Sequence, residues 1–368
     1  MRVLLCGGGT AGHVMPAIAI AEIIEKNFKG STVAFAGRRD GNENKAYKET
    51  GHKLYTLEIS GLSRTLCINN VKSFLKLIKS GRIAREIIKE FNPDVIIGTG
   101  GYVCYPFIRQ GQRMKIKTVM HESNVYPGLV TRLLGKRCDK LLLNLEGTRD
   151  YLKRTGNTEV VGNPIRSSFS SMHKSEARQR LGIKNDELLI ISFGGSLGAD
   201  KLNEAIIGYI KKYSLKNDNI RHIHATGRAR YNKIKETHPE LFSKGATIQI
   251  LPYIDNMPLL LTAADLAITR SGAITISELC RSGTPSILIP SPNVTANHQY
   301  VNASYMRDIG AAQIIEEKDL NCDALKVTVS TLTKNDDLMK RMSRCARRAY
   351  RRNTDQKIAN ILNKLING

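Results

Sequence analysis

A glycine-rich turn near the start of the chain has the clearest capacity for chemistry. Residues 7–12 read Gly-Gly-Gly-Thr-Ala-Gly, and His13 follows them as a helical pattern begins. Glycines let the backbone turn sharply and let a ligand approach the amides, and the first turn of a helix attracts anions. The turn therefore predicts a phosphate or nucleotide site that His13 faces. A plain tight turn is the alternative, because the dinucleotide fingerprint on its own is a weak signal.

Two further polar segments lie directly after predicted strands in the same half of the chain. Residues 100–102 read Gly-Gly-Tyr, and residues 121–124 read His-Glu-Ser-Asn. Parallel strands end at one edge of a sheet, where the ligands of open α/β sheets bind. We therefore expect the three segments to converge, with His121 and Glu122 as candidates for acid–base catalysis. In the alternative interpretation these two residues cap and brace loops.

The plan of the first segment recurs in the second half of the chain. An apolar run at 188–193 precedes a Gly-Gly-Ser-Leu-Gly-Ala turn at 194–199, and a helical pattern follows at 201–213. Glycine turns at equivalent places in two halves predict two phosphate sites that face each other across a cleft.

A polar helix start and a pair of amides add possible sugar-binding groups. Ser271 and Gly272 begin a helical pattern in which Glu278 could accept hydrogen bonds from both hydroxyls of a ribose. The amides of Gln299 and Asn302 suit sugar hydroxyls, which need donors and acceptors together. The alternative for these amides is a capped surface helix.

The elements that must position these residues alternate between strands and helices along the chain. Runs that are apolar on both faces and alternate with helices predict parallel sheets covered by helices, an α/β fold of two Rossmann-like halves. The Gly-Asn-Pro-Ile-Arg segment at 162–166 is typical of a linker, and it divides the chain into domains 1–163 and 164–349. Strands are predicted at 2–6, 32–36, 53–59, 94–97, 117–120, 141–143, 159–161, 188–193, 220–225, 247–251, 266–269 and 286–289, with further helices at 71–91 and 338–365.

The composition favours a polyanionic partner. Lys and Arg number 56 against 33 Asp and Glu, a formal net charge of +23, which attracts nucleic acid, phosphorylated ligands or anionic membranes; a general bias toward lysine is the alternative. The seven cysteines are scattered without a C-x-x-C pair, which fits a reducing cytosol. No apolar run reaches the ~18 residues of a membrane span, so we expect any membrane contact to be peripheral.

The second predicted strand tests the nucleotide-cofactor interpretation. An NAD site needs Asp or Glu about 20 residues after the glycines to hold the ribose, whereas this strand ends in Gly37-Arg38-Arg39. NAD is therefore disfavoured, although the arginines leave an NADP enzyme open. Carboxylates do not cluster with metal-site spacing, so we expect neither a cofactor nor a metal.

Two basic segments suggest binding surfaces for anionic partners. The segment 71–85 interleaves apolar and cationic side chains, a pattern typical of a helix on an anionic membrane or of an ordinary surface helix. The basic residues near the C-terminus suggest nucleic acid, but Tyr350 is the only ring among them and the chain has no Trp. Stacking platforms are therefore few, and we expect no nucleic-acid partner.

The order of the motifs resembles the MurG family of bacterial peptidoglycan glycosyltransferases, which transfer N-acetylglucosamine (GlcNAc) from UDP-GlcNAc to lipid I and so make lipid II. The segments that carry the resemblance are 7–13, 100–102, 121–124, 162–166, 194–199, 270–278 and 298–302. The sequence departs from the family at Ala11, where glycine is usual, and at Ser123, where glutamine is usual.

The resemblance implies the GT-B fold, with two Rossmann-like domains facing across a cleft and a C-terminal helix at about 350–368 that packs back on the first domain. The first domain would bind the acceptor, undecaprenyl-pyrophosphoryl-MurNAc-pentapeptide (lipid I), and the second UDP-GlcNAc. The family acts in peptidoglycan synthesis, cell shape and cell division at the cytoplasmic face of the cell membrane. Other cell-wall and division proteins are further candidate partners. A UDP-GlcNAc 2-epimerase of the same fold is the alternative.

The resemblance also assigns roles to residues. His13 is the first candidate for the catalytic base and Glu122 the second. The UDP-GlcNAc site would comprise Thr10, Ala11, Gly12, Asn124, Arg166, Ser196, Ile254, Arg270, Ala273, Thr275, Glu278, Gln299 and Asn302. The acceptor diphosphate loop would comprise Gly9, Gly100, Gly101 and Tyr102, and the membrane patch Lys72, Phe74, Leu75, Ile78, Lys79 and Arg82.

Overall fold

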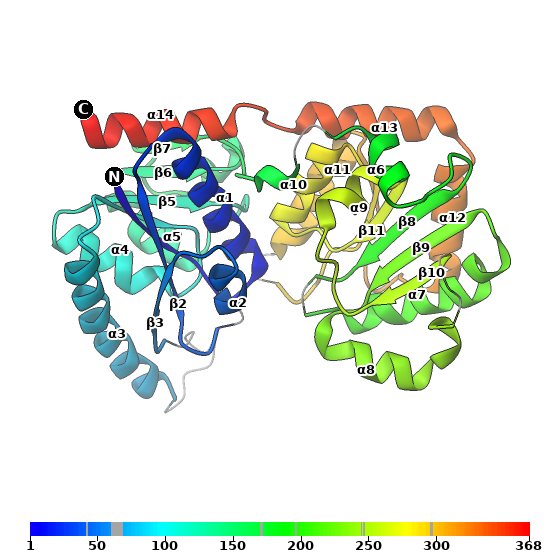
Figure 1. Cartoon of the computed structure of the whole chain (residues 1–368), viewed down its shortest axis with the longest axis horizontal. Helices are drawn as coiled ribbons and strands as arrows, with labels where there is room; N and C mark the ends of the chain where they lie inside the picture. The colour runs from blue at the N-terminus through cyan, green and yellow to red at the C-terminus, as the bar shows by residue number, and fades with distance from the viewer. Residues whose placement is uncertain are drawn as a thin grey trace. The chain divides into compact units, whose positions relative to one another are not determined.

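The computed structural model describes residues 1–41, 43–59, 69–169, 172–195, 197–243, 245, 247–294 and 297–368, and it describes the side chains of the helix that starts at residue 69 only from residue 79 onward. The chain divides into two compact units (Figure 1). Unit 1 comprises Met1–Ser167 together with Arg351–Gly368, and unit 2 comprises Ser168–Tyr350.

Unit 1 is built on a parallel sheet of seven strands in the order β3-β2-β1-β4-β5-β6-β7. The order reverses between β1 and β4, where Val3 pairs with Val95 and Cys6 with Gly98. Such a reversal opens a crevice at the carboxyl ends of the two strands. The strands are β1 (Arg2–Cys6), β2 (Thr32–Arg38), β3 (Lys53–Leu57), β4 (Val95–Gly98), β5 (Lys117–Glu122), β6 (Lys140–Leu143) and β7 (Thr158–Val160).

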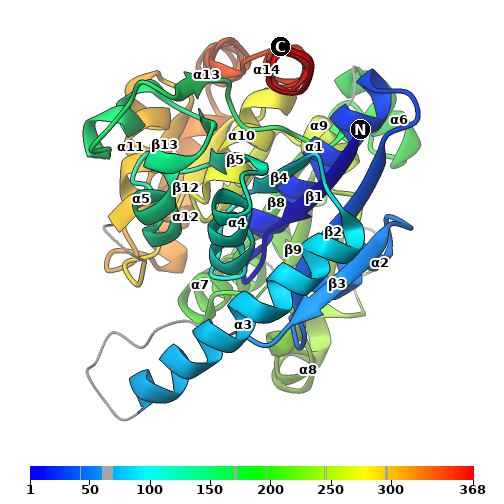
Figure 2. The same ribbon diagram turned by 90° about the vertical axis from the view of Figure 1, so that its left-hand side faces the viewer.

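Helices cover both faces of this sheet (Figure 2). Alternate residues of a strand point to opposite faces, so Val3 and Leu5 join one core and Leu4 and Cys6 the other. The first core contains α1 (Ala11–Asn27), Tyr47 of α2 (Glu43–Lys48) and α14 (Thr354–Asn367). The second contains α3 (Asn69–Phe91), α4 (Cys104–Arg113) and α5 (Leu129–Leu134).

Unit 2 repeats this plan with six parallel strands in the order β10-β9-β8-β11-β12-β13. Its strands are β8 (Leu188–Phe193), β9 (Ile220–Ala225), β10 (Ile248–Leu251), β11 (Leu266–Thr269), β12 (Ser286–Leu288) and β13 (Ala312–Ile314). The order reverses between β8 and β11, which gives unit 2 its own crevice. Its helices are α6 (Lys174–Arg180), α7 (Asp200–Lys212), α8 (Arg228–Thr237), α9 (Met257–Ala263), α10 (Ala273–Ser282), α11 (His298–Asp308), α12 (Cys322–Thr333) and α13 (Asp336–Ala349).

The predicted strands are confirmed within two residues at their ends, and the two Rossmann-like sheets are those expected. The edge strand β13 was not predicted, because three residues are too few for a periodic pattern. The helical segment predicted at 338–365 is interrupted, because α13 ends at Ala349 and α14 begins at Thr354. The break is where the chain returns to unit 1, and there the Thr354 hydroxyl donates to the carbonyl of Val161 at 2.7 Å.

Two properties of the described part of the chain bear on function. Among those residues, no helix is both long enough and apolar enough to cross a bilayer. The same residues contain no group of three or more His, Cys, Asp or Glu side chains that could hold a metal ion.

Candidate active site

In unit 1 the glycine turn after β1 and the one after β4 lie against each other. The amide of Gly8 donates to the carbonyl of Gly100 at 3.3 Å. Gly101 has a φ of +83°, and a Cβ at this position would lie 2.2 Å from the carbonyl oxygen of Gly8. Only glycine fits such a left-handed, close approach, so the two predicted loops converge at the crevice of unit 1.

His13 lies at this crevice, and a hydrogen bond fixes the tautomer of its ring. Its Nδ1 atom lies 2.9 Å from the carbonyl oxygen of Gly8. A carbonyl only accepts, so Nδ1 carries the hydrogen and the Nε2 atom of the neutral ring keeps its lone pair. The ring is partly exposed and passes over Gly100, where an added Cβ would lie 2.4 Å from its Cδ2 atom. His13 can therefore accept a proton from a group bound at this crevice.

A buried carboxylate that the sequence analysis missed supports the same turn. Glu43, only 3% exposed, accepts hydrogen bonds from the amide of Arg38 at 3.0 Å and from the amide of Gly9 at 3.3 Å. One amide of the glycine turn is thus already bound to an internal anion. The amides of Thr10, Ala11 and Gly12 stand at the start of α1, where N–H groups lack intrahelical acceptors. No sequence pattern pairs Glu43 with a turn 34 residues earlier.

Glu122 is committed to ordering the loop that follows β5. Its carboxylate accepts from the amide and the side chain of Asn124, at 3.1 and 3.3 Å, from the amide of Gly128 at 2.9 Å and from the hydroxyl of Thr131 at 2.8 Å. Four donors occupy the lone pairs of the carboxylate. The arrangement favours a positioning role for Glu122 over that of a base.

His121 is a core residue. It is 1% exposed, its Nε2 atom donates to the carbonyl of Gly162 at 3.0 Å, and burial lowers its pKa. With its donor used and no access to solvent, His121 joins β5 to the segment after β7. These contacts favour the bracing alternative for His121 over acid–base catalysis.

In unit 2 the turn after β8 packs on the turn after β9. Gly198 has a φ of +77°, and a Cβ there would lie 2.2 Å from the carbonyl oxygen of Thr226. Asn203 of α7 donates to the same carbonyl at 2.9 Å. The predicted Ser196 lies outside the described residues. The turn at Thr226 and Gly227 was missed, although a glycine between a predicted strand and a polar helix was a usable signal.

The segment after β11 is held by its own side chains. The guanidinium of Arg270 donates to the carbonyl of Ile289 at 3.1 Å and forms an ion pair with Glu317. The hydroxyl of Ser271 donates to the carbonyl of Gln299 at 2.7 Å. Arg270 is thus tied into the scaffold around the crevice of unit 2.

The predicted amides are also engaged. The side-chain oxygen of Gln299 accepts from the amide of Ser291 at 2.9 Å, and the Nδ2 atom of Asn302 donates to the carbonyl of Ser271 at 3.0 Å. Asn302 is 4% exposed. The structure therefore brings Ser271, Gln299 and Asn302 together, mainly through contacts that hold the loops.

The remaining predicted residues are distributed over the two units. Arg166 is partly buried and Tyr102 is 42% exposed in unit 1. In unit 2, Ile254 is buried in the loop after β10, Ala273 and Thr275 lie in the first turn of α10, and Glu278 is buried further along this helix. On α3, Lys79 and Arg82 are exposed. The side chains of Lys72, Phe74, Leu75 and Ile78 lie outside the described part.

Comparison with known proteins gives the geometry its context. Residues 3–143 match the glycosyltransferase family 28 N-terminal domain and residues 189–361 the glycosyltransferase family 28 C-terminal domain. The chain is 36% identical over 366 residues to the UDP-N-acetylglucosamine–N-acetylmuramyl-(pentapeptide) pyrophosphoryl-undecaprenol N-acetylglucosamine transferase of Caldicellulosiruptor saccharolyticus, with 100% of this chain and 98% of the relative covered. The chain belongs to this transferase family.

Solved structures agree with this membership. The crystal structure of MurG from Acinetobacter baumannii superposes with a TM-score of 0.74 at 26% identity, covering 99% of both chains. A putative UDP-N-acetylglucosamine 2-epimerase from Listeria monocytogenes superposes with a TM-score of 0.70 at 14% identity, covering 98% of this chain and 94% of the other. The second likeness shows the fold alone. The epimerase alternative is therefore not favoured for this member of the transferase family.

Proposed function

We propose that this protein transfers GlcNAc from UDP-GlcNAc to the 4-hydroxyl of N-acetylmuramic acid in lipid I and so forms lipid II. The observation that carries the proposal is the end-to-end match to transferases of this name in a chain with a glycine-turn crevice in each of its two units. In this proposal unit 1 binds the lipid-linked acceptor and unit 2 binds the nucleotide sugar.

The proposed reaction is a single displacement with inversion. The acceptor hydroxyl oxygen forms a bond to the anomeric carbon, the bond from that carbon to the UDP oxygen breaks, and UDP leaves with the electron pair. The hydroxyl proton passes to Nε2 of His13, the ring nitrogen that the hydrogen bond to Gly8 leaves free. Glu122 acts as a positioning residue through Asn124.

The donor site of the proposal uses the edge of unit 2. The turn at 194–199 and the start of α7 would stabilise the leaving diphosphate. The backbone around Ile254 would contact uracil and Glu278 the ribose, while Gln299 and Asn302 would face the sugar. The scaffold bonds of Asn302 and Ser271 favour this use, because loops held in place before binding lose less entropy when the donor arrives.

The proposed membrane contact uses one side of unit 1. Exposed Lys79 and Arg82 on α3 are accompanied by a basic groove of about 400 Å³ beside α4. The charged residues that line this groove are Arg109, Arg113, Lys115, Lys117, Arg137 and Asp139. Five cations against one carboxylate suit the cytoplasmic face of a membrane with anionic lipids.

A substitution pair tests the membrane contact. Leu75→Ser together with Ile78→Ser should reduce co-sedimentation with phosphatidylglycerol vesicles, since apolar side chains supply the buried area. Val327→Ser in unit 2 is the control, because Val327 is a 65% exposed apolar side chain outside this surface. Equal vesicle binding by the two variants would remove the segment from the membrane contact.

The activity itself is tested with a soluble lipid I analogue and labelled UDP-GlcNAc. Label should move to the acceptor, without added metal, and UDP release should depend on the acceptor. Release of UDP at the same rate without acceptor would overturn the proposal and favour an epimerase-like reaction.

A further inference from the structure

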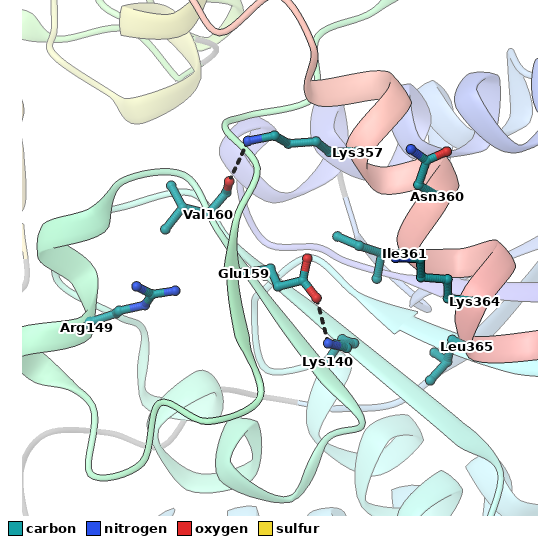
Figure 3. A pocket seen from close by; sticks show the side chains of 9 residues that line it. All are labelled: Lys140, Arg149, Glu159, Val160, Lys357, Asn360, Ile361, Lys364 and Leu365. Atoms are coloured by element: carbon teal, nitrogen blue, oxygen red, sulfur yellow. Dashed lines mark hydrogen bonds and ion pairs between the residues drawn. The ribbon is translucent and has the colours of Figure 1, made fainter. Parts of the chain in front are cut away.

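Unit 1 contains a second cavity, far along the sheet from the crevice of His13. It has a volume of about 460 Å³ and lies at the edge strand β7, which β5 and β6 separate from β4. Its lining comes from β6, β7, the 3₁₀ turn η2 (Glu146–Tyr151) and α14, through Lys140, Arg149, Glu159, Val160, Lys357, Asn360, Ile361, Lys364 and Leu365 (Figure 3).

The cavity has a strong excess of positive charge. Four cations, Lys140, Arg149, Lys357 and Lys364, share it with the single carboxylate of Glu159. In Figure 3 the ammonium of Lys140 points to Glu159, and that of Lys357 points to the carbonyl of Val160. Like charges gathered in a concave surface repel one another and raise the local affinity for an anion.

The carboxylate of Glu159 already pairs with one of these cations. Its Oε1 atom lies 2.6 Å from Nζ of Lys140, with the two side chains 41% and 34% exposed. Nζ of Lys357 donates to the carbonyl of Val160 at 3.4 Å. An ammonium has three N–H donors, so Lys140 and Lys357 each retain donors for a further acceptor.

Other side chains of the cavity are positioned without using all their donors. The guanidinium of Arg149 donates to the hydroxyl of Thr158 at 2.9 Å and to the carbonyl of Thr158 at 3.3 Å, and it forms an ion pair with Glu146. The side-chain oxygen of Asn360 accepts a hydrogen bond from Nε2 of Gln356 at 2.9 Å. This bond does not use the NH₂ group of Asn360. Among the described residues, Lys364 has no ion-pair partner. Val160, Ile361 and Leu365 add an apolar wall.

We propose that this cavity binds a ligand with a phosphate or diphosphate group of at least two negative charges. Clustered ammonium groups and an amide donor suit phosphate oxygens, and the apolar wall suits a small organic portion. A bound anion would contact both α14 and the β6–β7 edge, and would therefore stabilise the attachment of the C-terminal helix to unit 1. The shared chemistry belongs either to a free phosphate compound or to a lipid headgroup.

The experiment titrates inorganic pyrophosphate into the full chain at constant ionic strength, by calorimetry and by thermal unfolding. Pyrophosphate should raise the melting temperature, and above its Kd the increase should grow with the logarithm of the pyrophosphate concentration. Lys357→Ala with Lys364→Ala should weaken pyrophosphate binding about tenfold or more, since two charge-assisted contacts are lost. Lys48→Ala with Lys89→Ala is the matched control, since it removes the same charge from exposed sites of unit 1 outside the cavity.

A variant of opposite sign sharpens the test. Glu159→Gln should tighten pyrophosphate binding, because it removes the competing carboxylate and releases Lys140. Vesicles containing phosphatidic acid, whose headgroup is a phosphate monoester, form the second arm: a defect of the cavity variant in vesicle binding, without one for pyrophosphate, would assign the phosphate to a lipid headgroup. Identical behaviour of the cavity and control variants in both arms would overturn the proposal.

Discussion

The crevices of the two units are built alike but hold their side chains differently. In unit 1, the ring of His13 keeps a free acceptor nitrogen above the packed glycine turns. In unit 2, Arg270, Ser271 and Asn302 are bonded to neighbouring loops. The same strand–turn–helix plan thus leaves an unoccupied ring nitrogen at the edge of unit 1. At the edge of unit 2 it gives loops that are already held in place.

This difference indicates which unit carries out proton transfer and which unit holds the donor in the proposed reaction. Proton transfer needs a side chain with an unoccupied lone pair, which the edge of unit 1 supplies. Holding a flexible nucleotide sugar needs loops that are ordered beforehand, which the edge of unit 2 supplies. Substitutions of the same kind at the two edges should therefore have different effects on kcat and KM.

Removing the free imidazole should have the largest effect. His13→Ala should lower turnover of the soluble acceptor by about 100-fold or more, because general base catalysis is lost, while UDP-GlcNAc affinity measured by calorimetry stays close to that of the parent. His52→Ala, a partly buried histidine of unit 1 outside the crevice, is the control. Near-normal turnover of the His13 variant would remove this residue from the role of base.

A pair of glycine substitutions with the same predicted clash should separate the two edges. Gly101→Ala and Gly198→Ala introduce the same clash, with a Cβ 2.2 Å from a carbonyl oxygen at a positive φ, and strain of about 1–3 kcal/mol. We expect Gly101→Ala mainly to lower kcat and Gly198→Ala mainly to raise KM for UDP-GlcNAc, each by about tenfold. Steady-state kinetics with both substrates varied would measure kcat and KM for each variant. The same change in both variants would contradict the proposal that unit 1 carries out proton transfer and unit 2 holds the donor.

Acid should weaken unit 2 through a buried histidine pair. The Ser192 hydroxyl lies 2.8 Å from Nε2 of His222 and 2.8 Å from Nδ1 of His224, and burial lowers the two pKa values from 6.5 to about 3 and about 4. The folded chain keeps both rings neutral, whereas the unfolded chain binds protons below about pH 6.5. The contribution of these two histidines to the free energy of unfolding is therefore fully present above about pH 6.5. It declines as the pH falls toward 4, by at most about 1.4 kcal/mol per histidine and pH unit.

Hydrogen exchange at pH 7 and pH 5 would measure this effect strand by strand. Amides of β9 should lose more protection than those of β2, whose own residues include no histidine. A His224→Gln variant should show a shallower dependence on pH even if its stability is lower. Equal loss of protection in the two strands would contradict the assignment to the pair.

The smallest kinetic effect is expected at Glu122. Glu122→Gln replaces a carboxylate that accepts four hydrogen bonds with an amide that accepts fewer. We expect a loss of stability of about 1–2 kcal/mol and a decrease in kcat of less than about tenfold. A decrease as large as that of His13→Ala would instead make Glu122 the base.

Much of the fold followed from local patterns, and so did the position of the first crevice. The glycine turns at 7–12 and 100–102 were predicted to meet because both follow parallel strands, and the contact of Gly8 with Gly100 confirms this. The sequence analysis missed the contact of Glu43 with Gly9, whose partners are distant in sequence, and the burial of His121, which favours bracing over catalysis.

By itself, the sequence determined the alternation of strands and helices, the two glycine-turn edges and the excess of cations, because these depend on residue types and short spacings. Only the tertiary structure decided which ring nitrogen of His13 is free, that the C-terminal segment divides into α13 and α14, and that four cations from β6, η2 and α14 surround one cavity. Each of these depends on a contact between segments far apart in the chain, whose geometry no local pattern encodes.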